Sequence, residues 1–380
     1  MYITVKKTNQ ITNPSVNVVD ALFSGTTVTE LEPIGLQRTV TLNREESITN
    51  HVSYEMFMMA ARMIQQRAER HENPEEEYIT FRIPKKTHGF REINAPKEEL
   101  KADQKEIESV LTNYLGILTH DSAWAYVKHR DVVHAMHEHT NNNSRWYLKL
   151  DLHDFFGSCS PAFIKEQLLK IYPFAEYKNF EQCNTLIDNL IKIAVKDNGL
   201  PQGTPLSPTL TNLIMVEFDY KINRLLYQLT KDNNLIQQKY IYTRYADDII
   251  ISARNKFDYT IVVNAIKELF EGTPLQLNEE KTRFASNSGR NWNLGVMCNN
   301  KNETTIGYRR KQQLKSIIHN YLTDRENGNT WTLDDLYWLQ GQLSWLYNVE
   351  PEYSKGFIGY INNKYNTNLL SNIRLDIKNN

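Results

Sequence analysis

Residues 240–252 constrain this chain more than any other stretch, because they place two adjacent aspartates, Asp247 and Asp248, between two runs of β-branched and aromatic residues. Such runs favour strands. The segment Ala246-Asp247-Asp248 is therefore predicted at or near the turn of a β-hairpin, where two carboxylates project at one point. Paired carboxylates repel each other unless a cation lies between them, and their oxygens are ligands that suit Mg²⁺.

Composition sets broad limits on the rest of the chain. Its 380 residues suffice for one large multi-lobed unit or for about two to three domains. No run of about 18 apolar residues is present, and the first residues lack the charged-then-apolar layout of a signal peptide. The cysteines Cys159, Cys183 and Cys298 are far apart, so neither a zinc site nor a disulfide framework is predicted. We expect a cytoplasmic protein that does not enter a membrane.

The net charge is −1, which by itself argues weakly against nucleic-acid binding. The charge is unevenly distributed, however. Residues 69–77 are acidic, whereas the Lys85-Lys86 pair and the triplet Arg309, Arg310 and Lys311 are basic. Basic patches on a neutral protein can still follow a phosphate backbone. The basic, aromatic-rich tail is therefore a candidate for gripping a nucleic-acid duplex.

Residues 78–96 are typical of a second hairpin, because two alternating runs flank a Thr-His-Gly tripeptide. Lys85, Lys86 and Arg91 lie at its tip and on its return strand. Arginine offers a planar fork and lysine a point charge, so such a hairpin can clamp a triphosphate. The alternative is a solvated hairpin with ordinary surface cations, and these residues taken alone favour that alternative.

Apolar residues at helical spacing predict a series of helices. In the first, Met56, Ala60, Met63 and Ile64 form a stripe that we interpret as facing the core, and Ser53 suits a start signal. The predicted helices span residues 52–70, 100–118, 161–171, 180–195, 209–229, 258–271, 331–347 and 354–365, together with a basic helix from Tyr308.

Four of the ten histidines lie within residues 123–139. His134 and His137 are three residues apart, a spacing that can bind metal, but Glu138 alone offers a neighbouring partner. The preferred interpretation of the whole segment, His139 included, is an exposed or template-facing helix.

An apolar strand is predicted at residues 146–150, and it ends in Asp151. A carboxylate at that point can reach a ligand while neighbouring backbone N–H groups face an anion. The alternative is that Asp151 caps a helix and that Phe155 and Phe156 belong to the core. Asp154 is interpreted as structural or solvated.

Taken in order, these motifs resemble the reverse transcriptases. The resemblance covers residues 78–296, and the helical tail resembles the family's thumb more loosely. The Gln-Gly-x-x-x-Ser-Pro form and the Phe-Phe pair are similar to bacterial enzymes of the group II intron and retron lineage. The motifs are the basic hairpin from Lys85 to Pro96, Asp151-x-x-x-Phe155-Phe156, Gln202-Gly203-x-x-x-Ser207-Pro208, Tyr245-Ala246-Asp247-Asp248, Lys281-Thr282 and Leu294-Gly295.

The resemblance implies a metal site. Asp151, Asp247 and Asp248 would hold two Mg²⁺ ions, roughly 4 Å apart, with Mn²⁺ as a possible substitute. One ion would activate the primer 3′-hydroxyl, and the other would bind the triphosphate and steady the leaving pyrophosphate. The backbone carbonyl of Leu152 would complete the metal site.

It also implies a nucleotide site. Arg91, with Lys85 or Lys86, would clamp the triphosphate, and the backbone amides of Phe155 and Phe156 would add to the phosphate cradle. The Phe156 ring would be the steric gate, packing under the sugar where a ribose 2′-hydroxyl would clash. Its bulk predicts a preference for deoxynucleotides.

Other matching positions would contact the nucleic acid. Gln202 and Gly203 would line the nascent base pair, and Lys281 would lie near the phosphates. Tyr245 and Ala246 would face the primer end, and the Arg309-Arg310-Lys311 triplet would contact the primer–template duplex.

Some features depart from particular subclasses. Retron enzymes usually carry Asn-Ala-x-x-His before the first catalytic aspartate, whereas this chain reads His-Ala-Met-His-Glu-His at residues 134–139. They also tend to have Val-Thr-Gly where this chain has Asn-Leu-Gly at residues 293–295. Group II intron proteins continue into maturase and endonuclease regions. A retron-like or stand-alone defence-associated reverse transcriptase is the expected subclass.

The predicted fold is α+β: a right-hand polymerase with an antiparallel-sheet palm, fingers that carry the basic β-hairpin, and a helical thumb. The predicted regions are an N-terminal extension (1–50), fingers (51–145), palm (146–160), a fingers and palm insertion (161–205), palm (206–300) and thumb (301–380).

The predicted function is RNA-directed DNA synthesis from deoxynucleoside triphosphates. The expected partners are an RNA template and its RNA/DNA hybrid, with a cognate non-coding RNA and an effector protein in a retron-like or anti-phage system. One alternative is a template-independent or protein-primed DNA polymerase of an abortive-infection system. An alternative from another class is a catalytically inactive nucleic-acid-binding scaffold.

Overall fold

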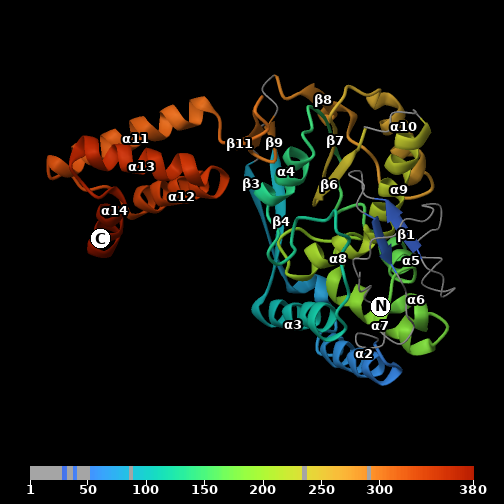
Figure 1. Ribbon diagram of the computed structural model, residues 1–380. Helices are drawn as coiled ribbons and strands as arrows, with labels where there is room; N and C mark the ends of the chain where they lie inside the picture. Colours follow the sequence, from blue (N-terminus) through green and yellow to red (C-terminus); the bar gives the residue numbers. More distant parts are fainter. Residues whose placement is uncertain (1–27, 32–36, 41–51, 85–88, 233–237, 289–291) are drawn as a thin grey trace. The chain divides into compact units, whose positions relative to one another are not determined.

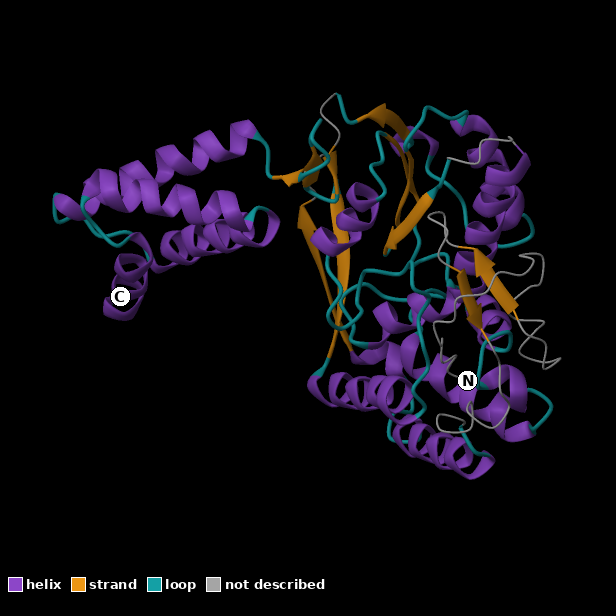
Figure 2. Cartoon of the chain, in the orientation of Figure 1, coloured by secondary structure: helices purple, strands orange, loops and turns teal. Residues whose placement is uncertain are grey.

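The computed structural model describes residues 28–31, 37–40, 52–84, 89–232, 238–288 and 292–380 (Figure 1). Helices alternate with short antiparallel sheets, which confirms the predicted α+β class (Figure 2). The described chain divides into two compact units, and neither is continuous in sequence. The first contains the residues up to Tyr126 with Asp151–Lys239 and Thr260–Asn278; the second contains Val127–Leu150, Tyr240–Tyr259 and Glu279–Asn380.

The first unit is mainly helical. Its strands pair as two separate hairpins, β1 with β2 and β3 with β4. Its elements are β1 (Val28–Leu31), β2 (Gln37–Val40), α2 (Tyr54–Ala68), η2 (Pro74–Glu77), β3 (Tyr78–Pro84), β4 (Phe90–Pro96), α3 (Glu98–Ser109), η3 (Val110–Tyr114), α5 (Pro161–Leu168), α6 (Phe174–Tyr177), α7 (Glu181–Ala194), α8 (Leu206–Ile214), α9 (Val216–Asp232) and most of α10 (Tyr259–Phe270).

Helix α2 begins as predicted, because the Ser53 hydroxyl accepts a hydrogen bond from the Met56 amide at 3.2 Å. The predicted methionine stripe is wrong in part. Met56 is exposed, and Phe57 instead occupies the core beside Ile64. The helix packs on α7, which presents a stripe of buried aliphatic residues.

The β3–β4 hairpin is confirmed, with Tyr78 opposite Pro96 and Pro84 opposite Phe90. Two predicted long helices are not continuous. The one predicted at 100–118 is α-helical to Ser109 and then continues as the π-helical turn η3. The one predicted at 209–229 is two helices, α8 and α9, separated at Met215.

The second unit contains a four-stranded sheet in the order β6-β7-β5-β8 and a three-stranded sheet in the order β11-β10-β9. Its elements are α4 (Val132–Asn141), β5 (Trp146–Asp151, with Asp151 assigned to the first unit), β6 (Ile241–Tyr245), β7 (Asp248–Ala253), η4 (Glu279–Lys281), β8 (Arg283–Ser286), β9 (Trp292–Asn293), β10 (Val296–Cys298), β11 (Thr304–Thr305), α11 (Tyr308–Glu326), α12 (Leu333–Val349), α13 (Pro351–Tyr365) and α14 (Leu369–Asn379).

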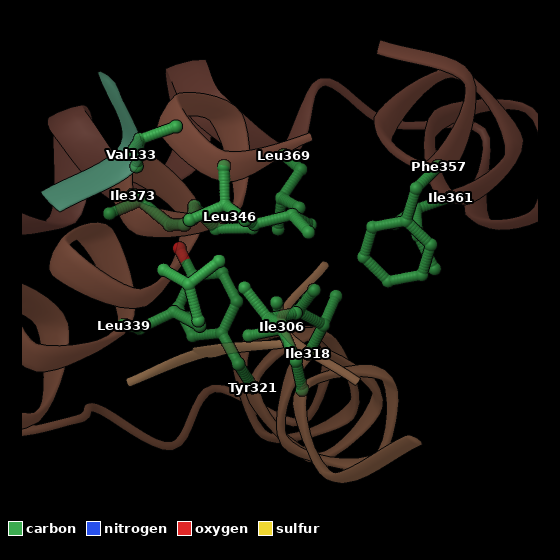
Figure 3. Packing of buried hydrophobic residues seen from close by; sticks show 14 of the residues in the cluster. Val133, Ile306, Ile318, Tyr321, Leu339, Leu346, Phe357, Ile361, Leu369 and Ile373 are labelled. Carbon is green, nitrogen blue, oxygen red and sulfur yellow. The ribbon is translucent and has the colours of Figure 1, made fainter. Parts of the chain in front are cut away.

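Helices α11 to α14 gather at the C-terminal end of the chain (Figure 1). Figure 3 shows Tyr321 of α11 gathered with Leu339 and Leu346 of α12, within a buried apolar cluster. The last helix, α14, was not predicted. It is fastened where Tyr321 Oη donates to Asp376 Oδ2 at 2.6 Å and Arg325 Nε donates to the same oxygen at 2.9 Å. The helical character of the tail is thus as predicted, whereas its division as a thumb stays a prediction.

Across the described residues, no helix is both long and apolar enough to cross a membrane.

Candidate active site

The Asp-Asp stretch forms the predicted hairpin. Strands β6 and β7 pair antiparallel, Tyr245 stands opposite Asp248, and Ala246 and Asp247 make the connection. Ala246 has φ 57°, in the left-handed region that residues with a Cβ rarely adopt. A strained residue of this kind persists where its surroundings fix the backbone, and such residues gather at functional sites.

The fully buried side chain of Arg244 helps to fix the Ala246 backbone. Its Nη1 donates to the Ala246 carbonyl oxygen at 3.3 Å. Burial, followed by the negative charge of Asp131, raises the pKa of Tyr245 above its ordinary value, so this phenol stays neutral. The strands behind the turn are apolar, since Ile249, Ile250 and Ile251 are all buried. The turn is therefore anchored by buried apolar strand residues.

A lysine that sequence reasoning missed contacts this hairpin. Lys149 Nζ on β5 lies 2.9 Å from Asp248 Oδ1, and both side chains are about three-quarters buried. Strand β5 is the neighbour of β7 in the sheet. Side chains alternate along a strand, so Lys149 shares its face of β5 with Asp151 two residues later. The Lys149-Leu150-Asp151 spacing in the sequence could have indicated that Lys149 lies on the same face as Asp151.

Asp151 is the last residue of β5, and its side chain is mostly buried. Within the first unit, its backbone carbonyl accepts a hydrogen bond from the Asn278 amide at 2.8 Å. Leu152 follows in an antiparallel bridge with Leu277. The chain then turns rather than starting a helix, so Asp151 is no helix cap. The predicted strand ending in a carboxylate is confirmed.

The two phenylalanines after Asp151 differ in environment. Phe155 is buried and Phe156 half-buried, and their ring centroids are 5.8 Å apart in an edge-on arrangement. The Phe156 carbonyl accepts from the Leu200 amide at 3.0 Å, which ties this turn to a Gly- and Pro-rich loop, residues 199–205. Asp154 is exposed, in agreement with a solvated role.

That loop contacts the β3–β4 hairpin directly. The Asn94 amide donates to the Gln202 carbonyl at 2.9 Å. Gly203 has φ +103°, and a Cβ there would lie 2.7 Å from Ile93 Cγ2. Only glycine fits this close approach. The first unit therefore brings Gln202 and Gly203 to the strand that carries exposed Arg91, whereas Lys85 and Lys86 lie outside the described residues.

The remaining predicted cations lie in the second unit. Lys281 ends the short helix η4 and is exposed, as are Arg309 and Arg310 in the first turn of α11. Lys311 differs, because its ammonium pairs with Glu350 and lies 3.9 Å from the centroid of the Tyr353 ring. Its contact with nucleic acid stays a prediction, and a phosphate would have to compete with these two partners for the ammonium.

The interpretation of 123–139 as an exposed or template-facing helix is wrong for His139, which is fully buried. His134 is exposed and pairs with Asp131, the residue that caps α4. In the described part of the chain, no group of three or more His, Cys, Asp or Glu side chains is arranged to hold a metal ion. The prediction failed for His139 because the sequence pattern around this residue does not indicate that it is buried.

The geometry agrees with the comparisons to known proteins. A family model described as reverse transcriptase (RNA-dependent DNA polymerase) matches residues 83–318, more than half of the chain, and the chain belongs to that family. It is an RNA-directed DNA polymerase, as predicted. This result disfavours the alternative of an inactive scaffold.

Within that family the chain is retron-like. The Retron Ec83 reverse transcriptase of Escherichia coli is 28% identical over 313 residues, covering 79% of this chain and 91% of the relative. The Retron Ec73 enzyme of the same organism is 30% identical over 215 residues, covering 54% and 64%. The Retron Mx65 enzyme of Myxococcus xanthus is 29% identical over 253 residues, covering 64% and 55%. The chain thus spans less than two thirds of the latter two.

Solved structures of telomerases are also similar. Apo telomerase from Candida tropicalis is 12% identical with a TM-score of 0.44, covering 80% of this chain and 60% of that one. Telomerase from Candida albicans is 13% identical with a TM-score of 0.41, covering 78% and 56%.

Proposed function

We propose that this enzyme copies RNA into DNA by two-metal nucleotidyl transfer, with Asp151, Asp247 and Asp248 as the metal ligands. The observation that carries the proposal is the sheet order. Strand β5, which ends in Asp151, is the neighbour of β7, which begins with Asp248. Carboxylate oxygens are the donors that Mg²⁺ prefers, and Mn²⁺ takes the same ligands. The ammonium of Lys149 at Asp248 shows that this point attracts positive charge.

The residues present fit a metal site whose ligands come partly from the substrate better than a site formed by protein ligands alone. No ready-made cluster of three ligating side chains exists in the described residues. Mg²⁺ is commonly held by one or two carboxylates together with substrate phosphates. Bound there, the metal would polarise the primer hydroxyl and neutralise charge on the pyrophosphate. We propose that the Leu152 carbonyl adds a further oxygen ligand.

The surrounding residues would bind and orient the nucleotide. Arg91 would hold the triphosphate through its planar fork, with Lys85, Lys86 and Lys281 adding charge. The backbone amides of Phe155 and Phe156 would bind the phosphates, and the Phe156 ring would exclude a ribose 2′-hydroxyl. This turn is tied to the Gln202-Gly203 loop through Leu200, which supports one continuous nucleotide surface within the first unit.

The nucleic acid would be held by the second unit. Tyr245 and Ala246 at the hairpin turn would face the primer end. Arg309 and Arg310 are exposed at the start of α11 and would contact the duplex backbone. Lys311 would do so once its ion pair with Glu350 is broken. The names of the relatives support a retron-like system, in which the template is a cognate non-coding RNA. An effector protein and a role in anti-phage defence belong to the same proposal.

The first experiment tests the carboxylates. In the double variant Asp247→Asn, Asp248→Asn, primer extension on an RNA template should fall by several orders of magnitude, because the amides cannot neutralise a metal ion. Asp154→Asn is the matched control, since Asp154 is exposed and is not required by the family pattern. Extension at the wild-type rate by the double variant would sink the metal-site proposal.

The second experiment tests templating. DNA that co-purifies with the protein should be the complement of one discrete RNA. Random DNA sequence would instead support the template-independent or protein-primed alternative, which uses the same active site.

A further inference from the structure

His139, at the end of α4, links both strands of the catalytic hairpin. It is fully buried, with Nε2 2.8 Å from Thr243 Oγ1 on β6 and Nδ1 2.6 Å from Ser252 Oγ on β7. Ser252 Oγ in turn donates to Ser144 Oγ at 2.8 Å. We call these four residues, His139, Ser144, Thr243 and Ser252, the hairpin clamp.

The clamp uses both nitrogens of a neutral His139 ring. A hydroxyl can donate or accept, so in either tautomer one ring nitrogen donates to its hydroxyl partner and the other accepts. None of the four clamp residues carries a carboxylate that would favour a protonated ring. Burial agrees with this assignment, because it lowers the pKa of His139 to about 3.

The clamp acts on the face of the hairpin that carries the proposed metal ligand. Ile241 stands opposite Ser252, and Tyr245 stands opposite Asp248. Because side chains alternate, Thr243 and Ser252 share one face with Tyr245 and Asp248. Ser252 is four residues from Asp248, or about 13 Å along an extended strand. His139 therefore acts on Asp248 through the strand and not by contact.

The same short segment fixes β7 against β5. Arg254 Nε donates to the Asn142 carbonyl at 2.7 Å, and the Arg145 amide donates to the Ala253 carbonyl at 2.9 Å. Strand β5 begins immediately after Arg145, at Trp146. The contacts of residues 139–145 with the far end of β7 thus set the offset of β7 along β5. The Lys149–Asp248 pair depends on that offset.

We propose that His139 is a positioning residue for polymerisation: in its neutral form, bonded to both strands, it holds the hairpin at the offset from β5 that places Asp248 for catalysis. The proposal rests on the metal-binding role proposed for Asp248. A histidine that only filled space would need no hydrogen-bond partners. His139 uses both ring nitrogens, and each faces a hydroxyl on a different strand of the hairpin.

The test compares two substitutions with an exposed control. His139→Phe keeps a planar ring but removes both nitrogens, whereas His139→Gln restores one N–H donor and one acceptor. His134→Phe alters an exposed histidine on the same helix. For each, kcat, the KM for a deoxynucleotide, the Kd for primer–template and the melting temperature are measured.

We expect His139→Phe to lower kcat by about 10- to 100-fold, the scale of a misplacement of about 1 Å. The KM and Kd should stay within about twofold, and His139→Gln should recover most of kcat. An unchanged kcat in His139→Phe below its melting temperature would overturn the proposal. Equal losses of kcat in the Phe and Gln variants would overturn it too, because the donor–acceptor pattern would then not matter.

Two further measurements keep the test decisive if His139→Phe does not fold. Thr243→Val removes one clamp hydrogen bond with little change of shape, and it should lower kcat without changing the Kd. In the wild-type enzyme, ¹⁵N spectra of labelled histidine should show a neutral His139 ring at about pH 5, where an exposed histidine is protonated; a protonated His139 ring there would contradict the clamp. Asp248→Asn separates the two proposals. If it retains activity, the metal-site proposal fails, whatever the protonation state of His139.

Discussion

Phe155 and Phe156 are consecutive in sequence but occupy different environments, one buried and the other half-buried. We expect Phe156→Ala to raise ribonucleotide incorporation relative to deoxynucleotide incorporation, because removing the ring opens space for a 2′-hydroxyl. The measurement is the ratio of kcat/KM for matched ribo- and deoxynucleotides on a primed RNA template.

Phe155→Ala is the matched control. It should lower the free energy of unfolding by about 3–5 kcal/mol, as for other buried phenylalanines, and leave the sugar ratio of the folded enzyme unchanged. A wild-type ratio in Phe156→Ala would mean that Phe156 is a core residue and that the gate lies elsewhere.

His139 also gives the fold a defined dependence on pH. Its folded-state pKa is lowered to about 3, below the 6.5 expected of the unfolded chain. Above pH 6.5 the stabilisation is fully present. As the pH falls toward 3, only the unfolded chain takes up the proton, so the free energy of unfolding falls by about 1.4 kcal/mol per pH unit. The comparison is urea unfolding of wild type and His139→Gln between about pH 7 and pH 5. Parallel pH dependences would contradict a neutral buried ring.

At this scale the local backbone setting of motif residues was predictable, whereas tertiary contacts were not. The hairpin turn at Asp247 and Asp248 could be predicted because the two residues are adjacent and flanked by strand-forming runs. Lys149 and His139 could not, because their partners lie 99 and 104 or more positions away, on strands that meet them only in the folded sheet. Lys311 has the sequence context of a free cation, but Glu350 pairs with it.

The start of α2 offers a prediction at the scale of an element. Ser53→Ala removes the acceptor for the Met56 amide and should lower the free energy of unfolding by about 1 kcal/mol. Thr185→Ala, at an exposed position of α7, also removes a hydroxyl, but it should be neutral or stabilising because alanine is the better helix former. Equal effects of the two substitutions in chemical denaturation would argue against the cap.

Elements whose apolar residues follow one period were predictable. The β3–β4 hairpin alternates, and α7 carries a clean stripe. The break between α8 and α9 was not, because every residue of α8 is buried except Pro208, so periodicity indicates no single face. The sequence around Met215 contains no Gly or Pro to mark a break. The π-helical turn at Val110–Tyr114 likewise depends on packing and leaves no local signal.

For the whole molecule, the order of six motifs sufficed to predict the family, which the match over residues 83–318 confirms. The division into two discontinuous units could not be predicted in the same way. Each unit is assembled from segments separated by parts of the other. Local composition carries no mark of such a boundary, and the boundary between Leu150 and Asp151 falls inside a single strand. The finer division into fingers, palm and thumb stays a prediction.

Three buried cysteines allow the cooperation of the units to be measured. Burial raises the thiol pKa of Cys159 to about 12 and those of Cys183 and Cys298 to about 11, so none reacts readily in the folded protein. The first two report on one unit and Cys298 on the other. In pulsed thiol labelling across a urea gradient, we expect all three to become reactive at the same midpoint, because the chain passes repeatedly between the units.

Labelling of Cys298 at clearly lower urea would show that the second unit opens by itself. Single-cysteine variants, with the other two positions changed to alanine, serve as controls for cross-reaction.

The interleaved segments also bear on synthesis of the chain. The first unit needs residues 260–278, and the second needs residues beyond 279, so neither can close early on the ribosome. Strands β5, β6 and β7 emerge before the helices α11 to α14 that complete their unit. A nascent chain thus carries all three aspartates before β8 has been made, so one edge of β5 is still unpaired. We expect polymerase activity to arise late and abruptly during translation, and incomplete chains to be removed by aggregation or proteolysis before they can copy RNA.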